Sequence, residues 1–128
     1  MAKGKIIFLN GTSSSGKTVL AKELQNHLDE PYLHFSIDTF LDMLPEKFLS
    51  GSKTEEIQRL IPGVISGMHH CIAAAAAVGN NIIVDHVLQH RQWLIECVEL
   101  LVDYPVLFIG VNAPLEELER RERERDRG

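Results

Sequence analysis

The sequence contains few of the residues that cross-link a small protein. It has only two cysteines in 128 residues, Cys71 and Cys97, and no CxxC pair. A chain of this length buries enough apolar surface to fold without cross-links. We therefore predict a single domain spanning residues 1–128, in which both cysteines are reduced core thiols.

Basic charge and long apolar runs are also scarce. The formal net charge is −5, which excludes the overall basic surface of a typical nucleic-acid-binding protein. No stretch reaches the roughly 20 apolar residues of a membrane span. The early apolar run Ile6–Leu9 is too short for the core of a signal peptide. We expect a cytoplasmic protein without nucleic-acid or membrane partners.

What the sequence does contain is a regular alternation of strand and helix patterns. Asp38–Leu44 fits a loop or a short helix. A further helix is expected to begin near Lys53, and Pro62 with Gly63 should break or kink it. The alternation indicates an α/β domain with a mainly parallel sheet. The expected strands are Lys5–Asn10, Leu33–Ile37, Asn81–Val87 and Val106–Val111, and the expected helices are Thr18–Leu28, Val64–Val78, His90–Val102 and Leu115 to about Arg125.

The first expected strand leads into a phosphate-binding motif. Residues 11–18 match GxxxxGK[ST], with a strand pattern before them and a helix pattern after them, as the motif requires. The glycines let backbone N–H groups converge on an anion, and the start of the helix adds its positive end. Lys17 is expected to reach the transferring phosphates, and Thr18 to ligate Mg²⁺. The predicted nucleotide-binding residues are Gly11, Thr12, Ser13, Ser14, Ser15, Gly16, Lys17 and Thr18.

Two other interpretations of this loop fit the residues less well. One is a flexible Gly/Ser turn without a ligand. The other is a dinucleotide-binding loop, in which Asp38, 22 residues after Gly16, would bind a ribose. The GxGxxG pattern is absent, however, and a lysine directed at phosphates has no role in such a site.

Two aspartates are expected at the same sheet edge as the phosphate loop. Asp38 follows the second expected strand and Asp85 ends the apolar part of the third, and parallel strands bring their carboxyl ends to one edge. Asp38 fits a general base that accepts the proton of an alcohol, and it also fits a helix cap. Asp85 fits a Mg²⁺ ligand, a substrate contact or a cap.

Histidines give a weaker signal than these aspartates. His86 and His90 have the spacing of a metal-binding pair, but the sequence offers no obvious third ligand, so we interpret both as surface or rim residues. His69 and His70 are adjacent in a helix pattern and should point to different faces, which argues against joint metal binding.

The end of the chain is rich in arginine and glutamate. Its arginines fit a lid that neutralises charge in the transition state, or a solvated helix whose charges pair with the interleaved glutamates. The acids between the basic residues disfavour a nucleic-acid-binding tail. The candidates for lid residues are Arg120, Arg121, Arg123, Arg125 and Arg127.

Taken in order, four segments of the chain resemble chloramphenicol phosphotransferase and its relatives. They are residues 8–18, 34–40, 81–87 and 110–122. The resemblance covers essentially the whole chain. It implies a P-loop kinase that moves the γ-phosphoryl group of ATP to a hydroxyl of a small molecule.

The resemblance also implies roles for individual residues. Asp38 would be the general base, and Gly11–Thr18 would bind ATP. The catalytic residues would be Asp38, Lys17 and the lid arginines Arg121, Arg125 and Arg127, with Thr18 and Asp85 as Mg²⁺ ligands.

The resemblance further implies a three-layer fold with strand order 2-3-1-4-5. Family members continue into another helix and a fifth strand, whereas this sequence stops at Gly128. We therefore expect four strands in the order 2-3-1-4, with residues 115–128 as a lid-like helix. Val106–Val111 would then be an apolar edge strand, which invites self-association.

The predicted function is an ATP- and Mg²⁺-dependent small-molecule O-phosphotransferase. The alternative is a nucleotide-binding protein with little or no turnover, because the family's C-terminal segment is absent from the sequence. The identity of the acceptor alcohol does not follow from these residues. The expected walls of its pocket, which also fit plain core positions, are Phe40, Met43, Leu44 and Phe48.

Overall fold

The computed structural model describes residues 2–12, 16–49 and 54–111. Strands and helices alternate through most of this part of the chain, as the sequence predicts. The elements are β1 (Ile6–Asn10), α1 (Lys17–His27), β2 (Tyr32–Ser36), α2 (Ile37–Leu41), α3 (Glu46–Leu49), α4 (Thr54–Ala77), β3 (Asn81–His86), α5 (Arg91–Leu100) and β4 (Val106–Gly110).

The four described strands form one parallel sheet in the order β2-β3-β1-β4. This confirms the predicted order 2-3-1-4. In the register, Leu9 of β1 lies opposite Asp85 of β3, and Asp85 lies opposite Ser36 of β2. The carboxyl ends of the strands therefore meet at one edge, where the candidate site must be sought.

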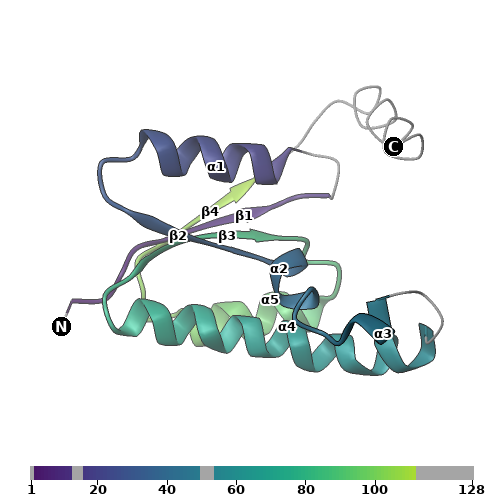
Figure 1. Cartoon of the computed structure of the whole chain (residues 1–128). Coiled ribbons are helices and arrows are strands. Elements are labelled where there is room, and N and C mark those ends of the chain that lie inside the picture. The colour runs from purple at the N-terminus through teal and green to yellow at the C-terminus, as the bar shows by residue number, and fades with distance from the viewer. Residues whose placement is uncertain (1, 13–15, 50–53, 112–128) are drawn as a thin grey trace.

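Helices cover both faces of the sheet and make the predicted three layers (Figure 1). Helix α1 lies on one face, and α4 and α5 lie on the other. The short helix α2 lies near the carboxyl ends of the strands, and α3 lies beside α4. The right-handed crossovers of parallel strands account for helices on both faces.

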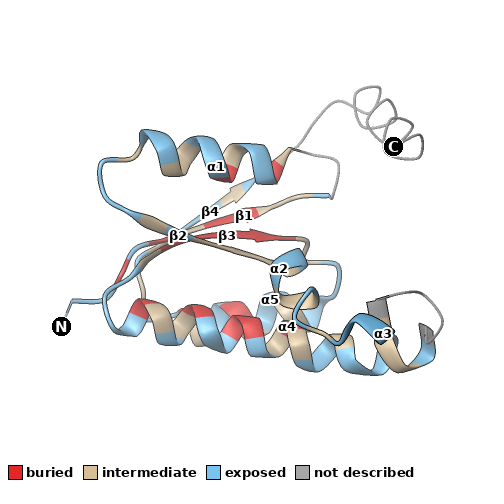
Figure 2. Ribbon diagram, viewed as in Figure 1, coloured by how far each residue is buried: buried red, intermediate tan, exposed pale blue. Residues whose placement is uncertain are grey.

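The core is centred on β1 and β3, which Figure 2 shows as the most buried strands. Both are flanked by strands and covered by helices, so their side chains are apolar on both faces. Toward α4 and α5 the larger cluster includes Phe8, Met68 and Ile72. Toward α1 the smaller cluster is built on Leu9 and Ile83.

Helix α4 does not break at Pro62, so that part of the prediction is wrong. The helix continues from Thr54 to Ala77 with Pro62 inside it. A proline removes one helical hydrogen bond, whereas the buried Ile65 and Met68 of the following turns anchor the helix on the sheet. Packing outweighs that local cost.

Helix α4 is also long and apolar enough, by length and composition alone, to cross a membrane over Glu55–Ala77. The core helix of a water-soluble protein passes the same test. Here Met68, Ile72 and Ala76 of this helix are buried in the cluster beneath the sheet.

Strand β4 is hydrogen-bonded to β1 and to no other strand among the described residues. Two of its apolar side chains remain accessible, Leu107 at 58% and Phe108 at 46%. Within the described part of the chain, β4 is therefore an apolar edge, as predicted.

Candidate active site

The phosphate loop begins directly after β1 and ends at α1. Gly16 has φ 91° and ψ 16°, the left-handed conformation that glycine adopts without steric cost. Its carbonyl accepts the first helical hydrogen bond, from Leu20 N at 3.0 Å. The first N–H groups of α1 have no helical partner and can face an anion. Ser13, Ser14 and Ser15 lie outside the described residues.

The side chain of Lys17 is held inside this loop. It is only 4% exposed, and its Nζ donates to the carbonyl of Thr12 at 2.7 Å. Burial lowers the pKa of Lys17, against the opposing influence of Asp85 and Asp38. A desolvated ammonium group attracts a phosphate more strongly than one in water.

Asp85, at the carboxyl end of β3, faces this lysine. Its Oδ1 lies 3.8 Å from Lys17 Nζ, and its Oδ2 accepts a hydrogen bond from Thr18 Oγ1 at 2.7 Å. Burial raises the pKa of Asp85, but His34, Thr18 and Lys17 together outweigh it and hold the pKa below its usual value. The carboxylate is therefore ionised at neutral pH.

The oxygens of Thr18 and Asp85 also fit a magnesium ion. A hydroxyl and a carboxylate are hard ligands of the kind Mg²⁺ prefers, and here they lie within hydrogen-bond distance beside the phosphate loop. The assignment of both residues as Mg²⁺ ligands stays a prediction.

His34 of β2 was missed by the sequence analysis. Its Nε2 lies 3.5 Å from Asp85 Oδ2, and this buried atom has no hydrogen-bond partner among the described residues. No motif singles out His34. It reaches Asp85 only because β2 pairs with β3 in the sheet.

Asp38 lies on α2 with its side chain exposed at the same site. The interpretation of Asp38 as a helix cap is wrong, because Ser36 caps α2: its Oγ accepts from Thr39 N at 3.2 Å. Asp38 is one residue inside the helix, and its carboxylate is left for another role.

These groups line one cavity of about 260 Å³ at the carboxyl edge of the sheet. Asp38, Asp85 and Lys17 all line this cavity, so the structure brings these three predicted charged residues together. The polar lining is Lys17, Thr18, Ser36, Asp38, Asp85 and Gln89, and the apolar lining is Ile37, Leu41, Ile61, Ile65, Val87 and Trp93.

The four predicted acceptor-pocket residues are not among the lining of this cavity. Phe40 packs against the core beside Phe35, with ring centroids 5.9 Å apart. Met43 is 68% exposed, and Leu44 follows α2 at a turn. Phe48 lines a separate hollow beside α4. Because α2 is helical, residues 37, 38 and 41 share the face toward the cavity, and residue 40 points elsewhere.

The interpretation of His86 as a surface or rim residue is wrong. His86 is fully buried, and its Nε2 lies 2.7 Å from Nε2 of His69. His90 is exposed, as expected, with its ring edge-on to Trp93 at 4.6 Å. His69 and His70 do point to different surroundings, one buried and one exposed.

The predicted lid arginines Arg121, Arg125 and Arg127, and the lid-like helix at residues 115–128, lie outside the described residues.

Solved structures with the same fold include kinases. A Chloroflexus aurantiacus protein described as a "putative kinase" has a TM-score of 0.78 at 21% identity, over 99% of this chain and 69% of its own. The APS kinase of Mycobacterium tuberculosis, solved with AMPPNP and APS, has a TM-score of 0.69 at 16% identity, over 95% and 70%. Such low identities establish the fold alone.

Sequence comparison is more specific. Two Mycobacterium tuberculosis proteins, from strains CDC 1551 / Oshkosh and ATCC 25618 / H37Rv, carry the name "Putative O-phosphotransferase" and are 34% identical to this chain over 145 aligned residues. The alignment covers 98% of this chain and 64% of each relative's length. The family model for chloramphenicol phosphotransferase-like proteins matches residues 4–128. Since that match spans nearly the whole sequence, this P-loop kinase-fold chain belongs to the chloramphenicol phosphotransferase-like family.

Proposed function

We propose that this protein is an ATP-dependent O-phosphotransferase that acts on a hydroxyl group of a small molecule. The observation that carries the proposal is a single cavity lined by Lys17, Thr18, Asp85 and Asp38. The first three suit the phosphates of a nucleotide, and the fourth suits the acceptor. The names of the relatives support the same class of reaction.

The donor side of the cavity would bind the phosphates of ATP. Lys17 would leave the Thr12 carbonyl, 2.7 Å away, for the β and γ phosphates, and the start of α1 would add backbone N–H donors. Thr18 and Asp85 would hold Mg²⁺, which when bound neutralises charge on the β and γ oxygens. The buried Asp85 keeps the charge of Lys17 balanced until a nucleotide arrives.

Asp38 would act as the general base on the acceptor side. Its carboxylate would accept the proton of the acceptor hydroxyl as that oxygen forms a bond to the γ-phosphorus, while the bond to the β–γ bridging oxygen breaks and ADP leaves. Lys17 would stabilise the charge on the transferring group. Arg121, Arg125 and Arg127 remain proposed as lid residues that add to this charge stabilisation.

The apolar half of the cavity would bind the body of the acceptor. Its walls come from α2, α4 and α5, and they include Leu41, Ile65 and the ring of Trp93. A volume of about 260 Å³ favours a small alcohol with an apolar part over a polymer. Use of ATP and the free thiols Cys71 and Cys97 favour a cytoplasmic location.

The experiment is phosphoryl transfer from γ-labelled ATP to a panel of small primary alcohols, chloramphenicol included, with Mg²⁺ or with EDTA. Asp38→Asn should keep ATP affinity within about threefold of wild type and lose transfer by at least the 10²–10⁴-fold expected of a general base. Lys17→Ala should weaken ATP binding itself. Asp42→Asn, on the same segment and outside the cavity lining, serves as the charge-matched control.

The outcomes separate the proposal from its alternative. Transfer that needs Mg²⁺ and Asp38 supports the kinase. ATP binding without transfer to any acceptor would favour a nucleotide-binding protein with little turnover. ATP affinity unchanged in Lys17→Ala would refute the role of the phosphate loop.

A further inference from the structure

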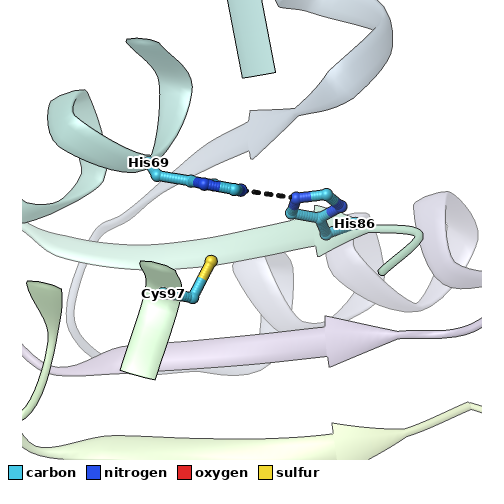
Figure 3. Close-up of side chains that lie close together, drawn as sticks. All are labelled: His69, His86 and Cys97. Carbon is cyan, nitrogen blue, oxygen red and sulfur yellow. Dashed lines mark hydrogen bonds between the residues drawn. The ribbon is translucent and has the colours of Figure 1, made fainter. Parts of the chain in front are cut away.

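Two histidines and a cysteine meet in the core behind the candidate active site. His69 comes from α4, His86 ends β3, and Cys97 comes from α5 (Figure 3). All three are buried, and one ligand atom from each lies within 4.8 Å of the other two. In Figure 3 the sulfur of Cys97 points toward the histidine pair.

A carboxylate determines which nitrogen of His69 carries the proton. Oε1 of Glu96 lies 2.6 Å from His69 Nδ1, and Glu96 is itself held by Ser66, whose Oγ donates to Oε2 at 2.9 Å. An ionised carboxylate only accepts hydrogen bonds, so Nδ1 of His69 is the donor. The lone pair on Nε2 of His69 then points at His86 Nε2, 2.7 Å away.

This arrangement matches the outer shell of protein metal sites. A metal-ligating histidine usually donates its other ring N–H to a carboxylate, which orients the ring and makes it a stronger ligand. Ser66, Glu96 and His69 supply that chain here. The nucleotide site uses none of these three residues.

We propose that His69 Nε2, His86 Nε2 and Cys97 Sγ bind a divalent zinc ion that joins α4, β3 and α5. Imidazole and thiolate together are ligands typical of Zn²⁺. Standard bond lengths with tetrahedral angles place the two nitrogens about 3.3 Å apart and each nitrogen about 3.6 Å from the sulfur. From the 2.7 Å between the two Nε2 atoms and the 4.8 Å limit of the cluster, the histidine pair must open by about 0.6 Å and the sulfur must approach by up to about 1.2 Å when the ion binds.

The protons balance on binding. The proton between the two Nε2 atoms moves to Nδ1 of His86, and the thiol proton of Cys97 is released to solvent. Zn²⁺, one thiolate and the Glu96 carboxylate then sum to zero net charge. The core therefore gains no uncompensated charge.

The environment of each ligand agrees with this chemistry. Burial lowers the pKa of His86 to about 4 and that of His69 below its usual value, so both are neutral imidazoles, the form that binds metals. Burial raises the pKa of Cys97 to about 12. A bound cation supplies the reason for a thiolate to form there.

The site would support the catalytic edge of the sheet without touching substrate. His86 follows Asp85 in the chain, and its ring lies 5.8 Å from that of Trp93 and 5.7 Å from that of Phe8. Trp93 lines the cavity. The ion would hold the end of β3 and the Trp93 wall in place.

The test uses the full 128-residue chain, stripped with EDTA and titrated with Co²⁺ as a spectroscopic substitute for Zn²⁺. We expect one Co²⁺ per chain and a thiolate-to-cobalt charge-transfer band. Cys97→Ala should lose that band, and Cys71→Ser, which removes the exposed thiol on α4, should keep it. Glu96→Gln should weaken Zn²⁺ binding about 10–100-fold.

Zinc should also raise the unfolding midpoint of wild type and Cys71→Ser, and not that of Cys97→Ala or His69→Gln. Circular dichroism checks that each variant is folded before titration. Absence of a charge-transfer band in wild type, or its survival in Cys97→Ala, would overturn the proposal and leave the cluster as a hydrogen-bonded chain. If Cys97→Ala does not fold, a wild-type cobalt complex without thiolate ligation would refute it equally.

Discussion

Asp85→Asn separates the electrostatic role of the buried carboxylate from its shape. The amide has nearly the same volume, but it is neutral and has one acceptor oxygen in place of two. Asp85 now faces Lys17 Nζ at 3.8 Å and accepts from Thr18 Oγ1 at 2.7 Å. In either orientation of the amide, its NH₂ group faces Lys17 Nζ or Thr18 Oγ1, so a hydrogen-bond donor replaces one of the two acceptor oxygens.

The expected cost follows from burial. The side chains of Lys17 and Asp85 are 5% and 8% exposed, and breaking a buried ion pair by removing one partner costs about 3–5 kcal/mol. The separation of 3.8 Å is at the long end for such a pair, so we expect about 3 kcal/mol. The control is Glu30→Gln, which breaks a shorter pair, Lys5 to Glu30 at 2.8 Å, whose side chains are 58% and 56% exposed. Solvent screens that pair, so its loss should change stability much less.

Urea unfolding measures both effects, with Trp93, the single tryptophan, as a fluorescent probe beside the cavity. ATP in EDTA should stabilise Asp85→Asn at least as much as wild type, because phosphate replaces the missing partner of Lys17. Adding Mg²⁺ should strengthen ATP binding to wild type but not to the variant. If Glu30→Gln destabilises the chain as much as Asp85→Asn, the argument from burial is refuted.

Three further predictions concern backbone space, acceptor binding and association. A Cβ on Gly4 would lie 1.8 Å from the carbonyl oxygen of Asn80, so Gly4→Ala should lower the free energy of unfolding by about 1–3 kcal/mol. Gly63 on α4 has open space around it, so Gly63→Ala should raise the free energy of unfolding by up to about 1 kcal/mol. Equal effects of the two substitutions in urea unfolding would contradict this reasoning. Trp93→Ala should raise the KM for the acceptor at least tenfold in transfer assays and leave ATP affinity within threefold, and the reverse pattern would remove Trp93 from the acceptor site. We also propose that the chain self-associates through the apolar edge Val106–Val111. Leu107 is exposed on this edge, so Leu107→Glu should increase the monomer fraction in sedimentation. A wild-type chain that stays monomeric at all concentrations would refute the proposal.

Local patterns were enough to predict the strands and the phosphate loop. Buried parallel strands need apolar runs, so Ile6–Asn10 and Asn81–His86 were recognisable within a residue or two. The loop motif requires glycine at a position of positive φ, and Gly16 has it. The predicted helix break at Pro62 was wrong, because tertiary packing of α4 outweighs a local breaking signal.

The acceptor side of the site was beyond such patterns. Its apolar walls come from α2, α4 and α5, and which face each helix turns to the cavity depends on how the helices cross the sheet. Phe40 and Ile37 are equally apolar in sequence and both pack against the core cluster, but the rotation of α2 places only Ile37 at the cavity as well.

Sequence alone therefore determined the fold class and the family of this protein. The strand patterns and the loop motif depend on residues that are close together in the chain, and the order of the acidic residues can be read directly from the sequence. Tertiary structure decided which side chains meet. His34 reaches Asp85 because β2 pairs with β3. His69, His86 and Cys97 converge because α4 and α5 pack on the same face of the sheet. Those contacts join residues distant in the chain, and only the free energy of packing selects them.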